Sequence, residues 1–174
     1  MRMKSGVAAC AAVLTLCLYG NAQTEDRSAN STLRTKSEKL DCSSLMNPVW
    51  NANQRGAAQA DCEFYNLSTE KGGDAWGEFA SNDAALPRGK GKEEIRKASI
   101  ALYARPGFRL LWKPDQAQPF GASFVVTSGR WERHLVNAAG KDEASHGRYV
   151  TVWQKQQDGS WRFVWDGGEA DPAK

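Results

Sequence analysis

The chain has 174 residues, seven tryptophans and a formal net charge of +3. This length suits one domain with a sizeable hydrophobic core. No block rich in lysine or arginine occurs, and two of the positive charges lie in a segment expected to be removed, which lowers the net charge from +3 to +1. The composition therefore excludes the strongly basic footprint of a nucleic-acid-binding domain.

Residues 1–22 have the pattern of an export signal. Arg2 and Lys4 form a charged start, and Val7–Tyr19 is an apolar run that is too short to cross a bilayer comfortably. Small residues precede a cleavage site after Ala22. We therefore expect an exported protein, periplasmic or secreted, that has no membrane contact after signal cleavage.

A lipoprotein signal is the competing interpretation, because small residues precede Cys10. Too little apolar sequence precedes Cys10 for such a signal, and Leu16 before Cys17 is too large. Signal cleavage leaves Cys42 and Cys62, which either form a disulfide closing a loop of about 20 residues or remain free thiols.

Composition also predicts a lead segment, a domain and a tail in the rest of the chain. Residues 23–47 are polar and have few large apolar side chains, so we expect a disordered lead there. A single domain is expected over residues 48–168, followed by a polar tail at residues 169–174.

Apolar residues spaced near 3.6 positions predict three helices in the first half of the domain: Asn51–Glu70, Ala75–Ala80 and Lys92–Ala104. A brief extended piece, Ala84–Leu86, and a loop at Pro87–Gly91 separate the last two helices. The loop sequence RGKG is glycine-rich and basic, but it lacks the spacing of a phosphate-binding loop.

The second half of the domain is rich in β-branched and aromatic residues, which indicate strands. A strand at Phe108–Trp112 is expected to end at Lys113-Pro114-Asp115. A long strand follows over Phe120–His134, with a bend or bulge at Gly129. A polar loop is expected over Val136–Ser145.

The stretch GRYVTVWQKQQDGSWRFVWD, residues Gly147–Asp166, predicts a β-hairpin with an Asp-Gly turn. If Lys155 faces Ser160 across a four-residue loop, Tyr149 directly opposes Asp166. This register places two groups of side chains on opposite faces, Trp161, Phe163 and Trp165 on one and Tyr149, Trp153 and Asp166 on the other. Helices followed by four or more strands predict an α+β fold, with about three N-terminal helices on one face of a bent antiparallel sheet.

The segment order and the stretches GKEEIRKA, SGRWE and GRYVTVWQKQQDGSWRFVWD resemble the nuclear transport factor 2-like superfamily. Within it, the chain resembles the SnoaL-like and domain-of-unknown-function 4440 branch, whose members are often called ketosteroid isomerase homologues. The match covers Arg55–Gly168. The resemblance implies a cone-shaped, cystatin-like roll with an apolar pocket under the helices and, in many members, a homodimer through the sheet. It implies no established reaction and no cofactor.

Three residues are candidates for acid–base chemistry. Ketosteroid isomerases use a carboxylate base together with a tyrosine and a protonated carboxylic acid. Asp83 precedes the sheet, where pocket mouths occur in this fold, and Tyr149 with Asp166 would form a hydrogen-bonded pair whose burial raises the carboxyl pKa. The competing interpretations are a turn residue for Asp83 and a structural cross-strand pair for the other two.

Four further residues are candidates for ligand contact: Trp76, Arg130, Trp131 and Trp153. Arg130 would meet an anionic ligand or else pair with a neighbouring acidic residue. His134 and His146 have neither the spacing nor the cysteine partners typical of metal sites, so no metal is expected. No nucleophile motif and no dinucleotide fingerprint occurs.

Three functions stay open. The first is an exported protein that binds an apolar or aromatic small molecule, which would require an open apolar pocket. The second is a cofactor-independent isomerase, cyclase or dehydratase that uses the three candidate residues for proton transfer, which would require a pocket carboxyl with a raised pKa. The third is a dimeric interaction module, which would require a broad apolar sheet face and no pocket.

Overall fold

The computed structural model describes residues 38–172, and the expected export signal lies outside this range. Helices α1 (Ala52–Lys71), α2 (Asp74–Phe79) and α3 (Lys92–Tyr103) pack on a six-stranded sheet. Its strands, in the order β2-β1-β6-β5-β4-β3, are β1 (Ala80–Leu86), β2 (Gly89–Lys90), β3 (Arg109–Phe120), β4 (Phe124–Val136), β5 (Asp142–Lys155) and β6 (Trp161–Ala170). Only β1 and β6 pair in parallel among these strands of residues 38–172. The predicted α+β fold is confirmed.

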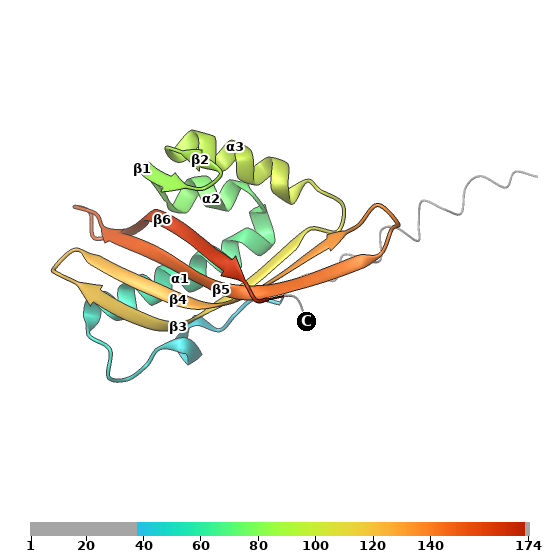
Figure 1. Ribbon diagram of the computed structural model, residues 1–174. Coiled ribbons are helices and arrows are strands. Elements are labelled where there is room, and N and C mark those ends of the chain that lie inside the picture. The colour runs from blue at the N-terminus through green and yellow to red at the C-terminus, as the bar shows by residue number, and fades with distance from the viewer. Residues whose placement is uncertain (1–37, 173–174) are drawn as a thin grey trace, which may run out of the picture. The chain divides into compact units, whose positions relative to one another are not determined.

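The helices cover one face of the sheet (Figure 1). α1 packs across β3 and β4, while α3 packs on α2 and on β1. Side chains from both layers meet in an aromatic core, in which Phe64 of α1 contacts Trp76, Trp112 and Phe163. None of the helices within residues 38–172 combines the length and apolar character needed to cross a membrane.

α1 begins and ends where the sequence predicts. The Asn51 side chain accepts a hydrogen bond from the Gln54 amide at 3.0 Å, and the Gln54 side chain accepts one from the Asn51 amide at 3.0 Å. Gly72 ends the helix with a φ of 57°, a value that glycine adopts without strain. The buried face of the helix carries Ala57, Ala58, Ala60, Asp61, Cys62, Phe64, Tyr65 and Ser68.

Residues 38–47, expected to belong to the polar lead, contact α1. Cys42 begins the short 3₁₀ helix η2 (Cys42–Leu45) and forms a disulfide with Cys62. The Leu40 amide donates to the Asn66 side chain at 2.8 Å, and the Asn66 side chain donates to the Leu40 carbonyl oxygen at 3.0 Å. The disulfide and this reciprocal pair attach the segment to the middle of α1.

β3 continues through Pro114, so the prediction that the strand ends at Lys113-Pro114-Asp115 is wrong. β3 is an edge strand, where a missing N–H group is tolerated, and its pairing with β4 shifts register between Pro114 and Gln116. Gly129 pairs with Pro114 beside this shift, and a Cβ atom there would lie 2.0 Å from the Lys113 carbonyl oxygen. The bend or bulge expected at Gly129 of β4 thus occurs in the partner strand β3, between Pro114 and Gln116.

The β4–β5 hairpin is longer than predicted, because its pairing continues as far as Val136 and Asp142. Only residues 137–141 form the turn, in which the Asn137 amide donates to the Lys141 carbonyl oxygen at 2.9 Å. The Asn137 side chain accepts from the Lys141 amide at 3.0 Å and closes the turn locally. The predicted loop over Val136–Ser145 is therefore too long.

The loop between β5 and β6 is one residue longer than predicted, because Lys155 pairs with Trp161 rather than with Ser160. A one-residue difference moves side chains to the opposite face of a strand. Trp161 and Phe163 are therefore buried on the same face as Trp153, and the predicted assignment of these two residues to the other face is wrong.

An extra residue in β6, Val164, shifts the register again beyond Phe163. Trp165 is consequently 40% exposed, and Asp166 returns to the inner face opposite Thr151. The predicted direct pairing of Asp166 with Tyr149 is wrong, although both side chains lie on the inner face as expected. The two irregularities together decide which side chains of this hairpin reach the space under the helices.

Candidate functional site

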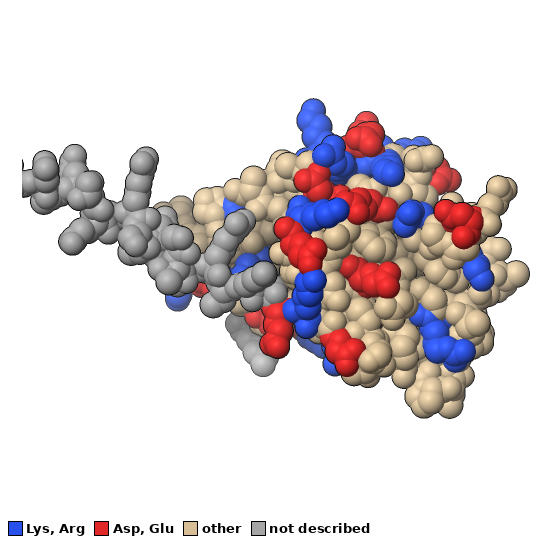
Figure 2. Space-filling view, turned by 180° about the vertical axis from the view of Figure 1, so that it is seen from behind, with Lys and Arg blue, Asp and Glu red and all other residues tan. Residues whose placement is uncertain are grey.

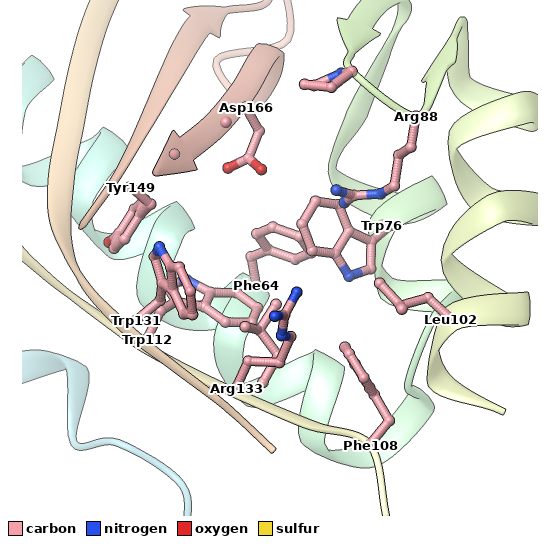
Figure 3. A pocket seen from close by; sticks show the side chains of 14 residues that line it. Phe64, Trp76, Arg88, Leu102, Phe108, Trp112, Trp131, Arg133, Tyr149 and Asp166 are labelled. Carbon is pink, nitrogen blue, oxygen red and sulfur yellow. The ribbon is translucent and has the colours of Figure 1, made fainter. Parts of the chain in front are cut away.

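An aromatic cavity of about 240 Å³ lies between the helices and the inner face of the sheet (Figure 3). Helices α1, α2 and α3 contribute to it, as do the β1–β2 turn and strands β3 to β6. Its lining comprises Phe64, Trp76, Pro87, Arg88, Leu102, Phe108, Leu110, Trp112, Trp131, Arg133, Tyr149, Asp166, Gly167 and Gly168. The volume lies just below the usual range of small-molecule sites, about 300–1,000 Å³.

Aromatic rings form most of the cavity wall and hold one another in place. Phe64 lies edge-on to Trp76 at a centroid distance of 4.9 Å and to Trp112 at 5.0 Å. The Trp131 indole N–H donates to the Arg148 carbonyl oxygen at 3.1 Å, which orients that ring. Such interlocked contacts favour a preformed site, because little side-chain entropy remains to be lost when a ligand binds.

Asp166 is the one carboxyl group among the cavity-lining residues. The Thr151 hydroxyl donates to its Oδ2 atom at 2.7 Å. Burial raises the pKa of Asp166 to about 6, although the Thr151 hydrogen bond and the positive charge of Arg88 oppose this shift. The nearby charge of Asp61 adds to the increase. A carboxyl group with this pKa exchanges a proton readily near neutral pH.

Asp61 of α1 is a second buried carboxyl group, and sequence reasoning missed it. Its Oδ1 accepts from the Trp112 indole at 2.9 Å, and its Oδ2 accepts from Thr127 at 2.6 Å and from Tyr149 at 3.0 Å. The Trp153 indole in turn donates to the Thr127 hydroxyl at 2.8 Å. Burial raises the pKa of Asp61 to about 6, while the three hydrogen bonds hold it lower than burial alone would.

Tyr149 lines the cavity, but its hydroxyl proton is donated to Asp61 and not to Asp166. A hydroxyl has a single proton to donate, so this contact leaves only acceptor capacity toward the cavity. Burial and the negative charge of Asp61 raise the pKa of Tyr149 well above its usual value. The catalytic roles expected for Tyr149 and Asp166 stay predictions, with Asp166 the better placed of the two.

Three candidates from the sequence do not line the cavity. Asp83 is exposed and accepts a hydrogen bond from Ser81 at 2.7 Å; both residues lie in strand β1 and not in a turn. Arg130 is exposed and pairs with Asp171. Trp153 is fully buried in the core behind the cavity wall. Trp76 and Trp131, the other two ligand-contact candidates, do line the cavity.

Arg88 and Arg133 are cavity residues that sequence reasoning did not single out. Arg88 comes from the RGKG loop, which was considered only as a phosphate-binding loop. Arg133 lies on β4 three residues after Arg130, and the alternation of the strand alone does not say which arginine faces the cavity. The signal for Asp61 was available, since it is an acidic residue on the apolar stripe of a helix.

The two histidines lie at the far end of the β4–β5 hairpin. His134 is held between Asp142, at 3.0 Å from Nδ1, and Glu132, at 2.6 Å from Nε2. The Nδ1 atom of His146 lies 3.8 Å from the same Glu132. Within residues 38–172, no group of three or more histidine, cysteine or acidic side chains has the arrangement of a metal site.

No protein-family model matches the chain, and no curated protein matches its sequence. Solved structures, by contrast, do match the chain. A ketosteroid isomerase-like protein from Erwinia carotovora atroseptica SCRI1043 matches with a TM-score of 0.62 and 15% identity, covering 71% of this chain and all of the other. A nuclear transport factor 2-like superfamily protein from Salmonella enterica serovar Typhimurium matches with a TM-score of 0.53 and 21% identity, covering 70% and 92%.

A domain of unknown function with a cystatin-like fold from Nostoc punctiforme PCC 73102 matches with a TM-score of 0.56 and 16% identity, covering 71% of this chain and 81% of the other. Identities this low show the fold alone. The chain therefore has the nuclear transport factor 2-like, or cystatin-like, fold, and the narrower SnoaL-like branch stays a prediction.

Proposed function

We propose that this chain is an exported protein that binds a small apolar or aromatic molecule in the cavity between its helices and its sheet. The observation that carries the proposal is the cavity wall, to which six aromatic side chains contribute: Phe64, Trp76, Phe108, Trp112, Trp131 and Tyr149. An engineered apolar cavity of about 150 Å³ holds benzene. A volume of about 240 Å³ therefore suits a single ring with a substituent better than a large polycyclic ligand.

Binding is tested with single-ring aromatic probes and NMR spectra that follow the indole N–H signals of Trp76, Trp112 and Trp131. Leu102→Trp fills the cavity from α3 and should weaken binding at least about tenfold, because a filled site admits no ligand. Ile100→Trp adds the same bulk to an exposed position of the same helix and should bind as the wild type does. Equal binding by the two variants, or no binding of any probe, would contradict the proposal.

Acid–base catalysis is a second candidate function, and Asp166 favours it. A carboxyl group with a pKa raised to about 6 faces the cavity, which is the feature that proton abstraction from a bound carbonyl compound requires. Asp83 lies outside the cavity, so any base must be Asp166 and the predicted role of Asp83 is not carried further.

Deuterium incorporation into phenylacetone in D₂O, followed by mass spectrometry, tests this second function. The wild type should exchange the protons next to the carbonyl faster than Asp166→Asn does, while both bind the ketone. Equal exchange rates for the wild type and Asp166→Asn would contradict the catalytic function and leave only the binding function.

A further inference from the structure

Two guanidinium groups face the aromatic cavity from separate parts of the chain. Arg88 enters from the β1–β2 turn, and its Cζ atom lies 4.0 Å from the centre of the Trp76 ring. Arg133 enters from β4, and its Cζ atom lies 5.8 Å from the centre of the Trp131 ring. Figure 3 shows both side chains directed toward the open space, Arg88 over Trp76 and Arg133 between the tryptophans and Phe108.

Neither arginine forms an ion pair with a carboxylate in the described part of the chain. By contrast, Arg96, Arg109, Arg130 and Arg148 each have an acidic partner there. Arg55, Arg105 and Arg162 also lack one among the described residues, but they do not line the cavity. Figure 2 shows that charges of both signs are interspersed on one face of the molecule. The two cavity arginines therefore differ from the paired ones, because their guanidinium groups keep free hydrogen-bond donors directed at a ligand site.

The charge balance of the cavity is positive. Asp166 attracts Arg88 through space, but it is hydrogen-bonded to Thr151 and not to either guanidinium group. Two cations and one carboxyl group thus surround a space whose other walls are apolar. Arg88 and Arg133 each keep an exposed part of the side chain. Burial of the Arg88 guanidinium lowers its pKa, but a guanidinium group stays charged in proteins, so an anion that enters the cavity meets two positive charges and one carboxyl group.

We propose that the ligand is a small organic acid, an aromatic or apolar ring bearing a carboxylate, with the carboxylate bound by Arg88 and Arg133. This inference rests on the proposed binding function and specifies its ligand class. Planar guanidinium groups match a carboxylate in shape and donate two parallel hydrogen bonds to it. The ring of the ligand packs among the aromatic walls. Arg88 lies over the Trp76 ring at 4.0 Å, which holds its donors in position, while Arg133 makes a longer cation–π contact of 5.8 Å with Trp131.

A matched pair of probes, benzoate and benzamide, tests the charge requirement by isothermal titration calorimetry at pH 7. The two have nearly the same shape and differ in charge. Benzoate should bind at least about tenfold more tightly than benzamide, since hydrogen bonds to charged groups are stronger than those to neutral ones. Phenyl phosphate should bind more weakly than benzoate; a preference for phenyl phosphate would overturn the carboxylate assignment.

Variants of the two cavity arginines test whether these side chains bind the carboxylate. Arg88→Gln and Arg133→Gln should each weaken benzoate binding by roughly tenfold or more and weaken benzamide binding by a smaller factor, because the amide oxygen accepts a weaker hydrogen bond than a carboxylate does. Arg130→Gln is the matched control, because Arg130 lies on the same strand as Arg133 but pairs with Asp171 outside the cavity. It should bind both probes as the wild type does. An unchanged indole N–H signal of the buried Trp153, which contacts neither arginine, shows that the variants remain folded.

The outcomes separate this inference from the proposed function. Equal affinities for benzoate and benzamide, or benzoate binding that neither cavity variant weakens, would overturn the organic-acid ligand and leave a site for neutral aromatic molecules. Failure of both probes to bind would overturn the ligand class together with the proposed function.

Discussion

Thr127 connects two buried polar groups, because its hydroxyl donates to Asp61 at 2.6 Å and accepts from the Trp153 indole at 2.8 Å. Thr127→Val leaves both the Asp61 carboxylate and the Trp153 indole N–H without their hydrogen bond to the threonine hydroxyl. Tyr149→Phe removes one hydrogen bond to Asp61 and leaves no other group without a partner. We expect the free energy of unfolding to fall by about 2 kcal/mol for Thr127→Val and by about 1 kcal/mol for Tyr149→Phe. Urea unfolding monitored by tryptophan fluorescence measures both. A larger loss for Tyr149→Phe would show that the network does not depend on the threonine.

Asp166 should make ligand binding depend on pH. Its folded pKa of about 6 lies above the ordinary value of 3.8, so the group is neutral below this pH and negative above it. A negative Asp166 repels a bound carboxylate, and benzoate affinity should therefore fall at least about fivefold between pH 5 and pH 7.5. The other charged or titratable groups around it are Arg88, Arg133, Tyr103, Tyr149 and Asp61.

Asp61 also has a pKa of about 6 and would contribute to the same pH profile. Asp166→Asn separates the two contributions, because it removes the nearer charge and leaves the Asp61 network in place. Calorimetric titrations at both pH values should show a profile that is clearly less steep for the variant than for the wild type. A profile as steep as that of the wild type would assign the pH dependence to Asp61 or to the ligand.

At the residue scale, sequence reasoning identified the aromatic wall better than its charges. Trp76 and Trp131 were selected because each sits beside polar residues at the end of an element, and both line the cavity. Arg130 was selected and Arg133 was not, because β4 alternates and the side that faces the helices depends on the packed sheet. Asp61 was not singled out, although an acidic residue on the apolar face of a helix is unusual.

At the scale of elements, the disulfide attaches η2 to α1. Cys42→Ser should lower the free energy of unfolding by about 3 kcal/mol, because the crosslink restricts the unfolded chain over a loop of 20 residues. Cys42 is the better position to substitute, since it is half-buried while Cys62 is fully buried. Urea unfolding of the variant and of the reduced wild type should agree. A wild-type mass that does not rise by about 2 Da on reduction would contradict the crosslink.

The register between strands is the feature of the elements that the sequence did not predict. The β5–β6 hairpin was predicted as a hairpin, but its loop is one residue longer than expected and β6 carries an extra residue at Val164. The longer loop and the extra residue each change the face of the side chains that follow. The two changes cancel at Asp166, which lies on the predicted face. They do not cancel at Trp161 and Phe163, which come before the extra residue. Both alternatives keep apolar side chains on each face of the hairpin, and only packing against α1 and α2 distinguishes them.

At the scale of the whole molecule, a homodimer through the sheet stays a prediction. Val150 and Trp165 are 38% and 40% exposed on the face of the sheet away from the helices. If this face joins two copies, Trp165→Lys should convert a dimer to a monomer, because a charge at a desolvated contact is costly. Light scattering coupled to size-exclusion chromatography measures the mass. Phe120→Lys, at the end of the β3–β4 hairpin, is the control and should stay dimeric; a monomeric wild type would contradict the prediction.

The sequence by itself determined the order and type of the main elements and hence the α+β fold, because helix periodicity, the Asn51 cap, Gly72 and the aromatic hairpin are local signals that read directly from neighbouring residues. Only the tertiary structure decided which side chains share the cavity. Asp61, Arg88, Arg133 and Asp166 lie far apart in the chain, and they meet because of strand register and the packing of helices on the sheet. Since one residue of register reverses the direction of a side chain, the chemistry of the site depends on packing that no local pattern encodes.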